Sequence, residues 1–178
     1  MVWFGGMLIS TSANASPKEE QFYASFENFC INLLNIPKAV PKMIEAIGGK
    51  PVASDKAKMM LQGKEGRVWL LKLEGIRSTL TQTSDNVCTM FGPDVDGSTV
   101  ENIFKKSSRS LLVGSEKIGS QTFSTYTLVQ ADPQGGSDIY AIITLTRSNL
   151  SSVGGVFLNA IPRGIAEKNG IKIKNWPK

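Results

Sequence analysis

The side chains that could perform chemistry are limited in kind, because the 178-residue chain contains no histidine. This count excludes the Ser-His-Asp and Cys-His catalytic arrangements and every zinc site with a histidine ligand. Two cysteines are also too few for an all-cysteine zinc or iron–sulfur site within one chain. The glycine-rich segments match neither a P-loop nor a dinucleotide-binding fingerprint. We therefore predict no catalytic residue, no metal ligand and no cofactor.

The acidic and hydroxyl side chains offer two further kinds of chemistry. Asp94 and Asp96 lie in a loop with Glu101 downstream, but the ligand spacing of an EF-hand is absent. Because Ser98 and Glu101 have the spacing of a capping box, we expect this segment to be a turn that begins a helix. A histidine-independent hydrolase could use a Ser–Lys dyad or paired carboxylates. The chain contains no S-x-x-K motif, and its 15 acidic residues are scattered.

Cys30 and Cys88 are the only two cysteines of the chain. An even pair in an exported protein is read as a disulfide, which is our prediction here. Cys30 belongs to the apolar stripe of an expected helix and Cys88 to an expected strand, an environment in which thiols are inert. If the protein is not exported, two unpaired core cysteines remain the alternative.

The first 15 residues have the character of a secretory signal peptide. They carry no charge, include a short apolar run and end in Ala13-Asn14-Ala15, the small-x-small pattern of a cleavage site. No basic residue precedes the run, so we expect this signal peptide to be truncated at its start. The run is shorter than the roughly 20 apolar residues that cross a membrane. Ser16 and Glu19 form a capping box around a proline, so we expect a helix of the mature protein to begin directly after the cleavage site. We therefore predict a periplasmic or secreted protein.

Hydrophobic periodicity predicts one α+β domain over residues 16–161, followed by a basic C-terminal tail over 162–178. We expect N-terminal helices packed on a mainly antiparallel sheet, with one further helix between two groups of strands. The expected helices cover residues 17–36, 41–47, 54–62 and 98–108. The expected strands cover residues 67–73, 76–83, 87–91, 111–117, 121–130 and 139–147.

The net charge of +5 is concentrated in two places. Lys105, Lys106 and Arg109 end an expected helix, where basic side chains suit the helix dipole. The tail holds Lys168, Lys172, Lys174 and Lys178, which could make a weak contact with an anionic surface. Trp176 is the only aromatic residue beside them, so we predict no nucleic-acid partner. Candidate partner contacts are Arg67, Trp69 and the loop 132–138. A structural role explains each of them better: a strand edge for Arg67, the core for Trp69 and solvent exposure for the loop.

Three segments carry a family resemblance. They are the Phe22-x-x-x-Phe26-Glu27-x-Phe29-Cys30 helix, the Gly66-Arg67-Val68-Trp69 strand entry and the run from Cys88 to Asp94. Over residues 16–160 the chain resembles an uncharacterised family of small exported bacterial proteins, some of them lipoproteins. The resemblance implies export and a disulfide, and it implies no active site. Unlike the lipoprotein members, this chain has no cysteine at its expected mature N-terminus.

These observations favour an exported, non-catalytic binding protein of the cell envelope. Such a protein would act through contact with another envelope protein, as an inhibitor, an immunity-type protein or an accessory subunit of a complex. The alternative is a histidine-independent hydrolase of the envelope. A pocket with convergent carboxylates would favour that alternative.

Overall fold

The computed structural model describes residues 17–107, 110–131, 137–148 and 155–171, and the side chains of 130, 131 and 137–139 are left aside. The first half contains, in order, α1 (Pro17–Phe26), the π-helical turn η1 (Glu27–Ile31), the 3-10 turn η2 (Pro37–Ala39), α2 (Val40–Ala46), β1 (Lys50–Pro51), α3 (Ser54–Met60), β2 (Gly66–Leu73), β3 (Ile76–Thr83) and β4 (Cys88–Gly92). The second half contains α4 (Gly97–Lys106), β5 (Ser110–Ile118), β6 (Gln121–Ala131), β7 (Ser137–Ser148), β8 (Val156–Pro162) and α5 (Arg163–Lys168).

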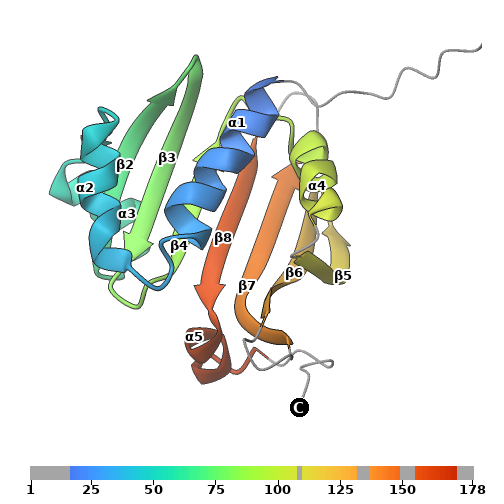
Figure 1. The fold of residues 1–178 in the computed structure, drawn as a ribbon. Coiled ribbons are helices and arrows are strands. Elements are labelled where there is room, and N and C mark those ends of the chain that lie inside the picture. The colour runs from blue at the N-terminus through green and yellow to red at the C-terminus, as the bar shows by residue number, and fades with distance from the viewer. Residues whose placement is uncertain (1–16, 108–109, 132–136, 149–154, 172–178) are drawn as a thin grey trace, which may run out of the picture.

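The strands form one eight-stranded antiparallel sheet in the order β1-β2-β3-β4-β8-β7-β6-β5. Two meanders, β1–β4 and β5–β8, therefore meet where β4 pairs with β8, with Met90 opposite Leu158. A helix precedes each meander, α1 the first and α4 the second, and both lie on the same face of the sheet (Figure 1). The predicted α+β fold is confirmed, and the chain repeats one architecture that its sequence does not reveal.

The face of the sheet beneath α1 and α4, called the helix face below, carries the main hydrophobic core. Strand alternation places every second residue there, as Cys88, Met90 and Gly92 of β4 are buried. The helices contribute the apolar stripe that their spacing predicts. The largest fully buried side chains of this core are Phe22, Phe26, Ile44, Trp69, Ile76, Leu80, Met90, Phe104, Tyr126, Ile143 and Leu145.

The first helix is shorter than its periodicity predicts. We expected it over 17–36, but the α-helix ends at Phe26 and the π-helical turn η1 follows. The wider turn changes the angular spacing of the side chains. As a result Phe29, Cys30 and Ile31 are buried one after another. This arrangement points the cysteine at the sheet while the aromatic stripe stays in the core.

Strand β8 and helix α5 were not expected from the sequence. Val156, Leu158 and Ala160 of β8 are buried on the helix face, at the centre of the sheet. The predicted tail over 162–178 is wrong for its first part, because α5 covers Ile142 with the buried Ala166. Residues 172–178, which include Trp176, lie outside the described residues.

Among the described residues, helices cover the opposite face, called the outer face below, only at its two ends. Near β2, helix α3 packs Ala57 and Leu61 on Val68. Near β7, helix α5 packs Ala166 on Ile142. The surface between these two helices belongs to β3, β4, β8, β7 and β6.

Candidate functional site

Cys30 and Cys88 form a disulfide, as predicted, with their Cα atoms 5.3 Å apart. The bond ties the π-helical turn η1 to strand β4, and both cysteines are buried. It is structural, since neither sulfur is available as a nucleophile. A buried disulfide is consistent with an oxidising compartment outside the cytoplasm. No helix within the described ranges is long and apolar enough to span a membrane.

Glu101 does not cap the helix α4, so that prediction was wrong. Asp96 is the N-cap, and its Oδ1 accepts a hydrogen bond from the Thr99 N–H at 2.7 Å. Glu101 is buried instead and faces the sheet. Its carboxylate accepts hydrogen bonds from Ser124 at 2.8 Å and from Tyr126 at 3.2 Å.

Two cations complete the surroundings of the Glu101 carboxylate. Arg147 Nε lies 2.9 Å from Oε2, and Lys105 Nζ lies 3.2 Å from Oε1. Burial alone would raise the pKa of Glu101, but the hydrogen bonds from Ser124, Arg147 and Lys105 outweigh burial and lower that pKa. Burial, with the neighbouring charge of Glu101, raises the pKa of Tyr126 far above its usual range. A carboxylate saturated by four donors anchors α4 to β6 and β7 and is a poor general base.

The other acidic candidates are also engaged in structural contacts. Glu19, expected in a capping box with Ser16, accepts a hydrogen bond from the Asp96 N–H at 3.1 Å and so ties α1 to the loop before α4. Ser16 itself lies outside the described residues. Asp94 forms an exposed ion pair with Arg77 at 3.0 Å. In the part of the chain that the structure describes, no three acidic or cysteine side chains are grouped closely enough to hold a metal ion.

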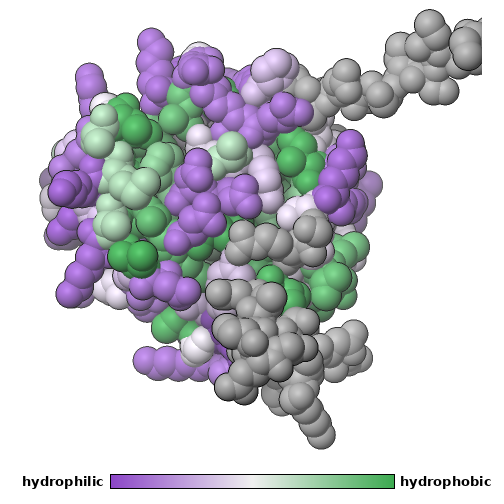
Figure 2. Space-filling model, in the orientation of Figure 1, coloured by the Kyte–Doolittle hydropathy of each residue, from purple (hydrophilic) through white to green (hydrophobic). Residues whose placement is uncertain are grey.

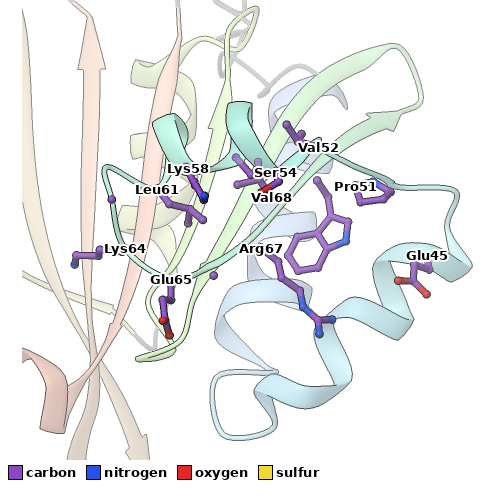
Figure 3. Close-up of a pocket in the computed structure, with 14 residues that line it drawn as sticks. Glu45, Pro51, Val52, Ser54, Lys58, Leu61, Lys64, Glu65, Arg67 and Val68 are labelled. Atoms are coloured by element: carbon purple, nitrogen blue, oxygen red, sulfur yellow. The ribbon is translucent and has the colours of Figure 1, made fainter.

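Arg67 and Trp69 lie two residues apart on the same face of β2 and have different environments. Trp69 is a core residue, only 2% exposed. Arg67 is exposed beside a groove of about 690 Å³ between α2, α3 and β2. Figure 3 shows Leu61 on α3, Val68 on β2 and Glu45 on α2 around this groove. Its charged lining residues have mixed signs, which indicates no particular ligand.

The remaining contact predictions fall mostly outside the described residues. The loop 132–138 is described only at 137 and 138, where β7 begins. Lys172, Lys174 and Lys178 lie beyond the last described residue, so the contact of the tail with an anionic surface stays a prediction. Lys168 ends α5.

The outer face holds a second groove of about 630 Å³, and its lining is almost without charge. Lys64 is the only charged residue among the described residues that line it. Its walls include Met60, Leu61 and Gln62 near α3, and its floor is formed by outward-facing side chains of β3, β4, β8 and β7. Threonine is the commonest residue of this floor.

The strand register arranges this floor in two rows of half-buried or exposed side chains. The polar row consists of Thr81, Thr89, Asn159, Thr144 and Thr125, one from each of five adjacent strands. The aromatic row consists of Thr79, Phe91, Phe157, Thr146 and Phe123 on the same five strands. Because the rows are two residues apart along each strand, they are separated by about 7 Å.

Specific contacts connect the members of each row. Thr89 donates its hydroxyl hydrogen to Asn159 Oδ1 at 2.7 Å, and Asn159 Nδ2 donates to Thr144 Oγ1 at 2.8 Å. In the aromatic row, Phe91 and Phe157 stack with ring centroids 4.2 Å apart and planes 19° apart. Phe157 is 41% exposed. The outer face therefore presents fixed hydroxyl and amide groups beside an aromatic surface.

Strand β5 forms a second unusual surface, at one edge of the sheet. In the part of the chain that the structure describes, it pairs only with β6, and nearly all of its residues are exposed. The segment Ser110–Ser115 reads SLLVGS and has no charge. Leu111, Leu112 and Val113 are 60%, 52% and 41% exposed. Figure 2 shows hydrophobic surface at this edge, to the right of the helices.

Comparison of the chain with protein-family models, curated proteins and solved structures finds no match. The two surfaces therefore have to be interpreted from their own chemistry. Neither was singled out by the sequence motifs. The alternation of threonine at 79, 81 and 83 was the one local signal of the outer face.

Proposed function

We propose that the protein is an exported, non-catalytic binding protein of the bacterial envelope, which acts by adding a strand of a partner protein to β5. The periplasm, or the outside of the cell after cleavage near Ala15, is the compartment of this proposal. The disulfide supports it, because such bonds persist in oxidising compartments. An inhibitor, an immunity-type protein and an accessory subunit are all compatible with this mode of action.

The observation that carries the proposal is the exposed edge of β5. Edge strands of monomeric proteins are commonly short, charged or covered, because their free backbone groups can pair with another chain. Strand β5 is nine residues long, and its first half is apolar and uncharged. A bulge at Val113 interrupts the register with β6 and leaves regular strand on both sides. An extended segment of a partner would pair with this edge and cover Leu111 and Leu112.

The alternative of a hydrolase has no comparable support. The two groups with shifted pKa values, Glu101 and Tyr126, are buried together under α4 and satisfied by protein partners. Neither residue lines the described grooves near β2 or on the outer face. We therefore keep one proposed function.

A comparative capture experiment tests this function. The mature protein is used to capture partners from an envelope extract, in parallel with two variants. Leu111→Lys changes β5, and Ile47→Lys is a control at the C-cap of α2, where Ile47 is 48% exposed. We expect a partner that binds the wild type and the control, is lost with Leu111→Lys, and slows amide hydrogen exchange in β5. Equal capture by all three proteins, or no capture, would overturn the proposal. So would a wild-type dimer that Leu111→Lys dissociates, because β5 would then bind a second copy.

A further inference from the structure

The outer face has a chemistry that partner binding at β5 does not use. Its groove has a volume within the range of about 300–1,000 Å³ that is typical of sites for small ligands. The polar side chains that line it are threonine, glutamine and asparagine, apart from Lys64. Anionic ligands such as phosphates or nucleic acids require clusters of Arg and Lys, which the described lining lacks. The described lining therefore suits an uncharged ligand.

The polar row has the hydrogen-bonding capacity that a hydroxyl-rich ligand needs. A threonine hydroxyl donates one hydrogen bond and accepts two, and an asparagine amide donates two and accepts two. The bonds from Thr89 to Asn159 and from Asn159 to Thr144 fix the orientation of these groups and use only part of that capacity. Such prepositioned groups lower the entropic cost of binding.

The aromatic row supplies the apolar half of the same surface. Phe157 stacks on Phe91 with one face and has Thr146 as its neighbour on the other side. Phe123 lies beyond Thr146 in the register, so the small Thr146 is flanked by two aromatic side chains. A pyranose ring has C–H groups on its faces and hydroxyl groups around its edge. It can place the C–H face against an aromatic ring while its hydroxyls reach the polar row.

We propose that the outer face of the sheet binds an uncharged oligosaccharide, with sugar rings against the aromatic row and hydroxyl groups on the polar row. The rows cross five strands, which span about 19 Å at the usual strand spacing. This length exceeds one sugar ring, so the ligand is an extended chain of several sugars. The proposal is independent of the β5 edge and adds a glycan to the partners of this protein.

Calorimetric titration with defined oligosaccharides tests the proposal. The probes are cellohexaose and hexa-N-acetylchitohexaose as uncharged chains, the corresponding disaccharides, and an oligogalacturonate as an anionic chain. We expect the mature protein to bind at least one uncharged hexasaccharide at least tenfold more tightly than its disaccharide. We expect no measurable binding of the oligogalacturonate. Failure of both uncharged hexasaccharides to bind, or equal binding of the anionic chain, would overturn the proposal.

Three variants locate the binding site. Phe157→Ala should weaken binding of the hexasaccharide at least tenfold, and Thr89→Val, which loses only the hydroxyl group, should weaken it at least threefold. Ile47→Thr changes an exposed residue at the C-cap of α2, which does not line the groove, and should bind like the wild type. Thermal unfolding confirms that each variant is folded. If folded Phe157→Ala and Thr89→Val both bind like the wild type, the outer face is not the site.

Discussion

The two faces of the sheet are built from neighbouring residues of the same strands, yet they have opposite surroundings. On β8, Leu158 is fully buried beneath the helices, whereas Phe157 beside it is 41% exposed on the outer face. The helix face is closed by a continuous apolar core and by a disulfide. The outer face has uncharged polar side chains and an aromatic stack that contribute little to closing a core. Stability and recognition can therefore be changed separately, by substituting adjacent residues.

The largest effect is expected from the disulfide on the helix face. Replacing Cys30 and Cys88 together by serine should lower the free energy of unfolding by about 4 kcal/mol, since the cross-link constrains the unfolded chain over a sequence separation of 58 residues. Urea denaturation of the variant and of the oxidised wild type measures this difference. A loss below about 1 kcal/mol would show that the helix face does not depend on the cross-link.

The next effect compares the two faces within one strand. Leu158→Ala should lower the free energy of unfolding by about 3 kcal/mol, because it leaves a cavity in the centre of the core. Phe157→Ala should cost about 1 kcal/mol or less, because the lost stack is at the surface. Denaturant titrations of the two variants give both values. Equal losses would contradict the division of β8 into a stabilising face and a binding face.

A smaller effect is expected from the carboxylate that anchors α4 to the helix face. Glu101→Gln should lower the free energy of unfolding by about 2 kcal/mol at neutral pH, because two hydrogen-bonded cations lose their partner. The pKa of Glu101 is lower in the folded protein than in the unfolded chain. Its contribution is therefore complete above the unfolded-state pKa of about 4.3 and is lost as the pH falls through the folded-state pKa.

Unfolding measured at several pH values tests this dependence. The difference between the wild type and Glu101→Gln should shrink as the pH falls below about 4. Glu167→Gln is the control, because Glu167 is an exposed glutamate that pairs with Arg163 on α5. This control should lie within about 0.5 kcal/mol of the wild type at every pH. A pH-independent difference for Glu101→Gln would exclude the lowered pKa.

The smallest effect on stability belongs to the polar row of the outer face. Thr89→Val keeps the shape of the side chain and removes one half-buried hydrogen bond, so the free energy of unfolding should change by about 1 kcal/mol or less. Thermal unfolding measures it. The same variant should lose affinity for the oligosaccharide. A large loss of stability would indicate that the polar row is part of the folding core.

Local patterns in the sequence predicted most helices and strands. They failed where contacts between residues far apart in the sequence determine the structure. The alternation in β2 and β3 and the apolar stripe of α1 were sufficient to predict those elements. Of the two interpretations of Trp69, a partner contact or a core residue, the core residue is confirmed. Strand β8 was missed, because Phe157 and Ile161 are large apolar residues on the outer face and obscure the alternation of a half-buried strand. Glu101 was assigned to a cap because it lies three positions after Ser98, the spacing of a capping box.

The two candidate surfaces depend on pairing between strands that are far apart in the sequence. The polar row exists only because β4 pairs with β8, which brings Thr89 beside Asn159. No single strand shows that row. The position of β5 at the edge follows likewise from the order of all eight strands. The pairing of Cys30 with Cys88 needed no such information, since two cysteines allow one bond within a chain.

The meeting of the two meanders at β4 and β8 has a consequence for how the chain matures. Cys30 and Cys88 both precede α4, so the cross-link joins η1 to the first meander and includes no residue of the second. The N-terminal part of a chain leaves the ribosome first. Oxidation can therefore lock the first helix onto its own strands before the second meander arrives. The last strand, β8, can then pair with β4 of the completed first half.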